Sequence, residues 1–363
     1  MKLQVTQENL NRALGAVARV ANTRGTLPIL ANVLIKTANN RLSISATNLD
    51  IAITQYIGGK VSEEGAITVP ARLMQDFISS LPSGVIDLEL EETKLKIVTD
   101  QYQSTVNGIM ADDFPVMPAI SEGQSWSIAS GTFKKGLQQV VFAASADESR
   151  PVLTGVLIHS SDGKLYLAAT DSYRLAEKEI GASKEDTSLL IPATAMHDLL
   201  RILGDGDEEV LVTHDDQQVL FRVGDVELVA RLLEGKYPDY RKLIPESFAT
   251  QVVLKRADFL NVTKVSSLFA RESAGSVTIK VDAGSQTLSI RSIASQLGEN
   301  TATANGTVTG DGEITLNSRY LLDALNAIDG DEVGFGFNGK LEATALRDAK
   351  ASGYTHIIMP LKS

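Results

Sequence analysis

One short segment carries the spacing of a nucleotide-binding loop. Gly334, Gly336 and Gly339 fit the pattern G-x-G-x-x-G, and Lys340 follows directly. In a dinucleotide-binding fold these glycines let the backbone approach a pyrophosphate, and they must follow a strand and open a helix within a βαβ unit. Here the segment follows a predicted helix and aligns with hairpins in other parts of the chain. The sequence therefore favours a strand and a turn, and an enzyme that binds a nucleotide there is the alternative.

The other residue types that could do chemistry form no constellation. Asp112-Asp113 and Asp147-Glu148 are carboxylate pairs, which by themselves are weak indicators of acid–base catalysis. The histidines lack the paired spacing of a metal site and are His159, His197, His214 and His356. The chain has no cysteine, which excludes disulfides, thiolate metal ligands and a cysteine nucleophile. We expect no catalytic residue, no metal and no cofactor.

The dominant signal in the sequence is a threefold repeat with a period of about 123 residues. Leu10, Leu14 and Val17 recur as Phe133, Leu137 and Val140, and Leu42 and Ile44 recur as Leu165 and Leu167 and then as Leu288 and Ile290. Solenoid repeats are much shorter, roughly 20–50 residues, and need their neighbours to bury a core. A copy of this length can be a domain of its own. We predict three homologous domains, at residues 1–120, 121–245 and 246–363.

Each copy contains the elements of a small α+β domain. Two segments per copy have the 3.6-residue apolar period of a helix, and several others alternate with the two-residue period of a strand. The predicted helices are 7–21, 71–80, 131–146, 193–203, 256–270 and 318–328. Turn residues such as Ser161-Asp162-Gly163 separate the alternating segments, which indicates antiparallel hairpins. The predicted fold class is α+β, with two helices packed on antiparallel sheet in every domain.

Charge is distributed unequally between these elements. The six predicted helices carry a formal charge of +4, which leaves −15 on the rest of the chain because the net charge is −11. The acidic residues gather after the second helix of each copy, at 87–92, 205–209 and 329–332. Segregated charge predicts two surfaces with different partners, and the helical surface is the one suited to a polyanion. No apolar segment approaches the ~20 residues of a membrane span, and no secretory leader begins the chain.

Two segments depart from the repeat. One combines Arg150–Gly155 with Ala169–Leu175, where the first copy has no counterpart to Tyr173-Arg174-Leu175. The other is the end of the chain, residues 354–361, which is too apolar for a free tail and is predicted to be docked. A departure from an internal repeat marks a place where one copy has a task of its own.

These segments resemble the bacterial DNA polymerase III β subunit family, the sliding clamps. The matching stretches run from residue 26 to the end of the chain: Thr26–Leu30, Val69–Arg72, Asp113–Pro115, Arg150–Gly155, Ala169–Leu175, Tyr237–Tyr240 and Ile358–Leu361. The resemblance implies three clamp domains per subunit and a head-to-tail homodimer that closes into a ring around double-stranded DNA. It also implies a non-catalytic processivity factor of the cytoplasm, associated with the nucleoid. The implied partners are the polymerase III α subunit, clamp-loader subunits and other proteins with a clamp-binding motif, with no membrane.

The resemblance also implies three sets of site residues. The partner-peptide pocket would comprise Arg150, Leu153, Thr170, Ser172, Tyr173, Arg174, Leu175, Pro238, Lys242, Leu243, Ile357, Ile358, Met359, Pro360 and Leu361. DNA contacts would be Arg24 and Arg72, to which the predicted helices add Lys134, Lys135 and Arg201. The dimer interface would join Leu73, Met74 and Phe77 to Leu268 and Phe269. The remaining alternative is a monomeric triplicated scaffold that binds peptides or glycans and never encircles DNA.

Overall fold

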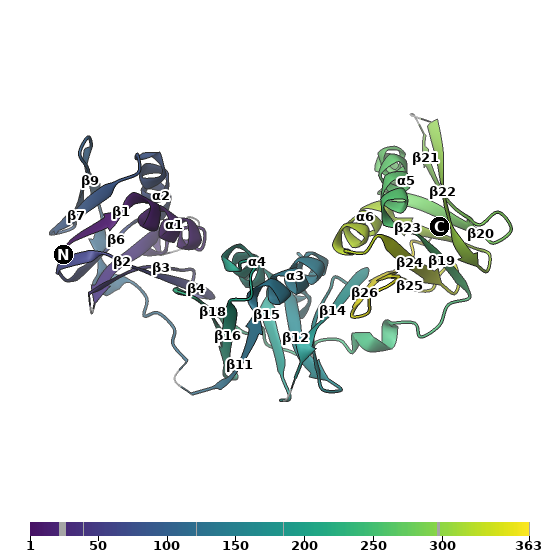
Figure 1. Ribbon diagram of the computed structural model, residues 1–363, viewed down its shortest axis with the longest axis horizontal. Coiled ribbons are helices and arrows are strands. Elements are labelled where there is room, and N and C mark those ends of the chain that lie inside the picture. The colour runs from purple at the N-terminus through teal and green to yellow at the C-terminus, as the bar shows by residue number, and fades with distance from the viewer. Residues whose placement is uncertain (22–26, 39, 121, 184, 296–297, 363) are drawn as a thin grey trace. The chain divides into compact units, whose positions relative to one another are not determined.

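The chain folds into helices and antiparallel sheets, as the hairpin pattern predicted. The computed structural model describes residues 1–21, 27–38, 40–120, 122–183, 185–295 and 298–362 (Figure 1). They form two compact units, one made of Met1–Gly131 and His197–Leu232 and the other of Thr132–Met196 and Leu233–Ser363. The middle third of the sequence contributes strands to both units, and the predicted α+β class is confirmed.

The first unit holds a five-stranded and a nine-stranded sheet with α1 and α2 packed together on them. Its elements from the first third of the chain are β1 Lys2–Thr6, α1 Gln7–Val17, β2 Asn32–Ala38, β3 Arg41–Thr47, β4 Ile51–Ile57, β5 Lys60–Glu63, β6 Gly65–Pro70, α2 Ala71–Ser80, β7 Val85–Glu91, β8 Lys94–Val98, β9 Gln103–Asn107 and β10 Ile109–Met110, with the 3-10 helices η1 Pro28–Ala31 and η2 Ala111–Asp113. The remaining strands are β11 Gln124–Ala129, β16 Glu209–His214, β17 Gln218–Val223 and β18 Val226–Arg231. Antiparallel pairing of β18 with β4 makes the nine-stranded sheet continuous.

The second unit is built on one twelve-stranded sheet. Its strands are β12 Gly155–Ser161, β13 Lys164–Thr170, β14 Arg174–Ala182, β15 Ser188–Pro192, β19 Thr250–Lys255, β20 Ser276–Asp282, β21 Thr287–Ala294, β22 Gly298–Thr309, β23 Gly312–Asn317, β24 Glu332–Phe337, β25 Thr344–Asp348 and β26 Tyr354–Ile358. Its helices are α5 Arg256–Phe269 and α6 Ser318–Ala327, with 3-10 helices η3 Val141–Ala143, η4 Pro151–Thr154, η5 Tyr240–Leu243 and η6 Arg271–Ser273. Pairing of β14 with β26 joins strands from the middle and last thirds. Two more helices, α3 Ser130–Val140 and α4 Ala193–Ile202, include the sequence boundaries of the units.

The internal repeat is visible in the helices. Leu10, Leu14 and Val17 are completely buried, and so are their counterparts Phe133, Leu137 and Val140. Both helices end at equivalent residues, Val17 and Val140, earlier than predicted. After Val17, the N–H of Val20 donates to a carbonyl three residues earlier, that of Val17, rather than four residues earlier as in an α-helix. After Val140 the chain continues as the 3-10 helix η3. The β-branched pair Val140-Val141 is unfavourable for continuing a helix, which accounts for the second of these ends.

The segment with the nucleotide-loop spacing is a strand and a turn. Gly334 and Gly336 lie in β24, which pairs antiparallel with β19 and β25, and no helix intervenes before β25. A phosphate-binding loop needs a helix N-terminus at this point. The strand-and-turn interpretation is therefore confirmed and the dinucleotide alternative is wrong.

Candidate functional site

The turn between β13 and β14 is fixed by its own side chains. The Asp171 carboxylate accepts hydrogen bonds from the backbone N–H groups of Tyr173 and Arg174, both at 2.9 Å. The Thr170 hydroxyl donates to the Arg174 carbonyl at 2.6 Å, and Ser172 has a left-handed φ of 79°. Tyr173 remains 59% exposed. The turn therefore presents Tyr173 to solvent on a backbone that is already ordered.

Arg174 is largely buried and supports this turn from beneath. Its guanidinium donates to Asp171 at 3.1 Å, to Asp323 at 2.6 Å and to the carbonyl of Phe142 at 2.7 Å. It also lies over the ring of Tyr320, at 4.6 Å from the centroid. Only 12% of the side chain is exposed. Three of its five N–H donors are used within the protein, and its place in the lining of the pocket stays a prediction.

The end of the chain is docked, as predicted. Strand β26 pairs with β14, so that Ile357 lies opposite Leu175. Beyond the strand, the N–H of Met359 donates to the carbonyl of Tyr173 at 2.8 Å and that of Leu361 to Thr315 at 2.9 Å. Because side chains alternate along a strand, Ile357 and Ile358 point to opposite faces of the sheet. Ile358 is completely buried, so its predicted place in the pocket lining is corrected to a place in the core.

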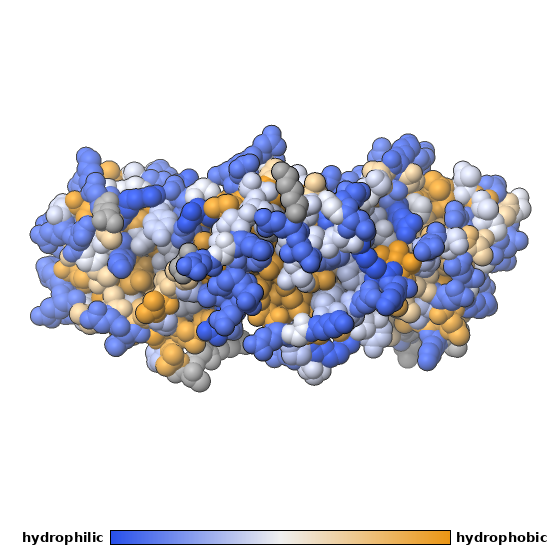
Figure 2. All heavy atoms as spheres, turned by 90° about the horizontal axis from the view of Figure 1, so that it is seen from below, coloured by the Kyte–Doolittle hydropathy of each residue, from blue (hydrophilic) through white to orange (hydrophobic). Residues whose placement is uncertain are grey.

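An apolar cluster lies on the Ile357 face of this sheet. Its buried members are Leu157, Ala168, Leu175, Leu190, Tyr240, Ala345 and Ile357, and Val152, Leu233, Tyr237, Ile244, Phe248 and Ala343 pack against them. The sequence predicted Leu175 and Ile357 but missed Tyr240 and Ala345. Tyr240 lies next to the predicted residues of 238–243, whereas nothing in the local pattern marks Ala345. Figure 2 shows apolar residues reaching a surface that is otherwise mainly hydrophilic.

The segment 237–244 borders this cluster and is anchored by a polar network. The Tyr240 hydroxyl donates to Glu177 at 2.5 Å and lies 2.6 Å from His159 Nε2. Arg241 donates to the same Glu177 carboxylate at 3.0 Å and stacks on Tyr166. Burial, and then the Glu177 charge, raise the pKa of Tyr240, while burial, and then Arg241, lower the pKa of His159. The network holds Tyr240 inward, which leaves Pro238, Lys242 and Leu243 exposed on the outside of the segment.

The remaining predicted pocket residues lie on the rim or beneath it. Arg150 donates to the Ser172 hydroxyl at 3.0 Å and forms an ion pair with Asp147, also at 3.0 Å. Leu153 is buried with only 5% of its surface exposed. The structure therefore brings Arg150 and the tail, from Met359 on, to the turn between β13 and β14. It also places Leu175 opposite Ile357.

The cations predicted to contact DNA differ in their exposure and in the ion pairs that they form. Arg72 is 89% exposed and lies 4.0 Å from Asp76. Lys135 forms an ion pair with Asp329 at 2.9 Å, and Arg201 forms one with Asp198 at 2.7 Å. Lys134 is half-buried. Arg24 lies outside the described residues.

The residues predicted for the dimer interface divide into surface and core. Leu73 and Leu268 are exposed to 53% and 49%, unusually high values for leucine, and Phe77 and Phe269 are partly exposed. Met74 is completely buried on the inner face of α2. Its predicted contact with a second subunit is therefore wrong, because successive helical residues point in different directions and Leu73 takes the outer position.

Three family models match the chain in sequence order and cover nearly all of it. They are the N-terminal domain of the DNA polymerase III beta subunit over residues 1–118, its central domain over 127–239 and its C-terminal domain over 241–362. The chain belongs to the DNA polymerase III β subunit family. The resemblance recognised in the sequence is thereby confirmed, and the three-domain α+β architecture is that of this family.

Relatives in this β subunit family match along their whole length. The beta sliding clamp of Staphylococcus epidermidis is 31% identical over 376 residues, covering 100% of both chains, and that of Staphylococcus aureus is 30% identical with the same coverage. The crystal structure of the sliding clamp from Bacillus subtilis has a TM-score of 0.95 at 27% identity and covers 100% of this chain and 99% of its own. The Bartonella birtlesii clamp, solved bound to griselimycin, has a TM-score of 0.95 at 28% identity over 100% of both chains.

The part of the chain that the structure describes contains neither a membrane-spanning helix nor a metal-binding group of side chains. None of its helices is long and apolar enough to cross a membrane. None of its groups of histidine and carboxylate side chains could hold a metal ion.

Proposed function

We propose that this protein is a DNA sliding clamp, a processivity factor that encircles duplex DNA and tethers replication proteins to it. The observation that carries the proposal is the consecutive match of all three domain models along one chain. We propose the domain boundaries 1–120, 121–245 and 246–363 on the same ground. The protein acts in the cytoplasm at the nucleoid and catalyses no reaction; it keeps a polymerase on its template.

The charge distribution suits loose contact with DNA. A net charge of −11 opposes binding to the outside of the protein, while the predicted helices carry a net formal charge of +4. Among the cations predicted to contact DNA that the structure describes, Arg72 is the most exposed. Ion pairs at Lys135 and Arg201 weaken their attraction for phosphate. Contacts of this kind are independent of base sequence and sensitive to salt. A protein held on DNA by closure of a ring needs only this weak field and can slide.

The partners bind as short linear motifs on the surface formed by the Tyr173 turn, the docked tail and the segment 237–244. This arrangement offers exposed Tyr173 and Leu243 above a buried apolar cluster, which is what the leucine and phenylalanine anchors of a peptide require. The proposed partners are the polymerase III α subunit, clamp-loader subunits and other proteins with a clamp-binding motif. Griselimycin bound to relatives shows that clamps of this family accept a ligand.

The subunits close the ring as a head-to-tail homodimer. Exposed Leu268 and half-buried Phe269 at the end of α5 meet Leu73 and Phe77 on α2 of a second copy. Removing large apolar side chains from such a contact typically costs several kcal/mol.

Light scattering coupled to size-exclusion chromatography tests the assembly. We expect a dimer for the native protein and folded monomers for the double variant Leu268→Ala, Phe269→Ala. The control, Leu341→Ala, removes an exposed apolar side chain from the turn between β24 and β25, outside α2 and α5, and should remain dimeric. A native monomer would support the triplicated scaffold, and a double variant that stays dimeric at low micromolar concentration would place the interface elsewhere.

A further inference from the structure

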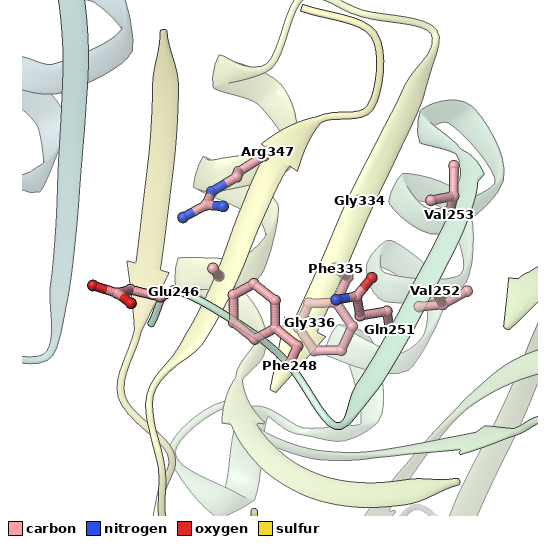
Figure 3. Close-up of a pocket in the computed structure, with 10 residues that line it drawn as sticks. Glu246, Phe248, Gln251, Val252, Val253, Gly334, Phe335, Gly336 and Arg347 are labelled. Carbon is pink, nitrogen blue, oxygen red and sulfur yellow. The ribbon is translucent and has the colours of Figure 1, made fainter. Parts of the chain in front are cut away.

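The outer face of the last domain contains a trough that the proposed peptide surface does not use. It follows β24, where Gly334 and Gly336 lie on the same face of the sheet because they are two residues apart. In the ladder, Gly334 lies between Val253 of β19 and Arg347 of β25, and Gly336 lies between Gln251 and Ala345. The two glycines have no side chain, whereas the four residues beside them do. The result is a hollow of about 210 Å³ (Figure 3). We call it the glycine trough.

The two glycines have different surroundings. A Cβ on Gly336 would lie 2.6 Å from the ring of Phe248, so this glycine is required by the ring that rests on it. A Cβ on Gly334 would meet nothing nearer than the Arg347 carbonyl oxygen at 3.9 Å. Glycine inside a strand weakens it, by roughly 0.5–1 kcal/mol relative to alanine, and often marks a close approach by another molecule. No neighbour among the described residues accounts for Gly334.

Arg347 supplies the trough with an unused hydrogen-bond donor. Its Nε is buried and has no acceptor in the described part of the protein, and the guanidinium lies 5.8 Å from the centroid of Phe248. A buried donor without a partner is costly, and a carboxylate is the acceptor that an arginine binds most strongly. Glu246, at the Phe248 end, directs its carboxylate away from that ring (Figure 3).

The size and the position of the trough define its occupant. A cavity of about 150 Å³ lined by apolar side chains can bind benzene, so the glycine trough has room for one aromatic ring. Phe248 packs against the apolar cluster that contains Leu175 and Ile357, and Ala345 belongs to both the cluster and the trough lining. A peptide anchored on that cluster therefore passes next to the trough.

We propose that the glycine trough is an accessory subsite for the segment that flanks a clamp-binding motif. The subsite takes an aromatic side chain over Gly334 and pairs an adjacent carboxylate with Arg347. It would favour partners whose motif is flanked by an acidic residue next to an aromatic one. This inference rests on the proposed peptide-binding function and adds a determinant of partner choice to it.

Calorimetric titration of the full-length protein with two peptides tests the subsite. The core peptide carries the glutamine, leucine and phenylalanine anchors, and the extended peptide adds Asp-Phe through a Gly-Ser spacer on each side. We expect the extended peptide to bind the native protein about tenfold more tightly, the scale of 1.4 kcal/mol. Gly334→Val places a Cβ no nearer than 3.9 Å to a neighbouring atom and projects its methyl groups toward the trough, so it should abolish this gain while leaving the affinity for the core peptide unchanged. Arg347→Gln should reduce the gain, and Arg291→Gln, which removes a surface arginine elsewhere in the same unit, should not.

The possible outcomes distinguish a failure of the subsite from a failure of the proposed peptide-binding function. Equal affinity of the native protein for both peptides would overturn the subsite, as would a gain that survives in Gly334→Val. Binding of the core peptide to Gly334→Val shows that this variant is folded. Failure of the native protein to bind the core peptide at all would contradict the proposed peptide-binding function and remove the basis of the subsite with it.

Discussion

At the scale of single residues, two largely buried groups hold the proposed peptide surface in place. Arg174 ties the Tyr173 turn to Asp323 of α6 and to the carbonyl of Phe142, and the Tyr240 hydroxyl ties the segment 237–244 to Glu177. Each anchor is half-buried or buried and uses several hydrogen bonds. Their role is to order the surface residues before a peptide arrives, which reduces the entropy lost on binding.

Arg174→Met tests this anchoring role. The substitution leaves the Asp171 and Asp323 carboxylates without their cation, and breaking a largely buried ion pair typically costs about 3–5 kcal/mol. We expect a lower midpoint of urea unfolding together with weaker peptide binding. Arg150→Met, which loses an exposed ion pair, should leave the free energy of unfolding nearly unchanged. Equal effects of the two substitutions on stability would contradict an anchoring role for Arg174.

His356 makes the stability of the second unit depend on pH. The side chain is completely buried and stacks on Phe142, with Tyr354 and Arg174 as its titratable or charged neighbours. Burial, and then Arg174, lower the pKa of His356 to about 3 from its usual 6.5. The unfolded chain therefore binds a proton first, so stability is complete above about pH 6.5 and falls as the pH drops toward 3, by about 1.4 kcal/mol per pH unit for this group.

Urea unfolding at pH 7 and pH 5 measures this dependence. We expect the native protein to lose stability on acidification and His356→Leu to lose less of it. His159, whose pKa is also lowered by burial, retains part of the effect in the variant. Identical losses in the native protein and in His356→Leu would show that His356 does not titrate in this range.

At the scale of elements, the docked tail is separable from the strand before it. Strand β26 ends at Ile358, and the two backbone bonds of Met359 and Leu361 attach the following residues to the site. Deleting residues 359–363 should abolish peptide binding and leave the fold and the dimer intact, while deleting only 362–363 should preserve binding. Wild-type affinity of the longer truncation, measured by calorimetry, would place the peptide elsewhere.

The sequence predicted the elements better than the directions of particular side chains. Helix and hairpin patterns are local, so α2 is predicted from residue 71 to residue 80 as observed, and the repeat predicts that Val17 and Val140 are equivalent. The ends of the helices that contain these two valines are nevertheless predicted too late. Whether Leu73 or Met74 faces outward depends on what packs beneath α2. The burial of Ile358 depends on which face of β26 the helices cover. The glycine trough could not be predicted, because Phe248 reaches Gly336 from a distant part of the sequence.

At the scale of the whole molecule, the threefold repeat, the segregated charge and the proposed peptide surface all suit a sliding clamp. The repeat supplies domains that pair strands edge to edge, as β4 with β18 and β14 with β26. Each of these pairings satisfies strand edges that would otherwise be open to aggregation. The weakly basic helices and the acidic remainder favour DNA that is enclosed over DNA that is bound from outside.

The lifetime of the protein on circular and on linear DNA tests the central claim most directly. After loading onto a nicked circular duplex, the protein should remain bound for a long time, and cutting the circle once should release it through the free ends. Blocking those ends with a bound protein should restore retention, because the hold is topological. Equal lifetimes on the closed circle and on linear DNA with unblocked ends would contradict encirclement.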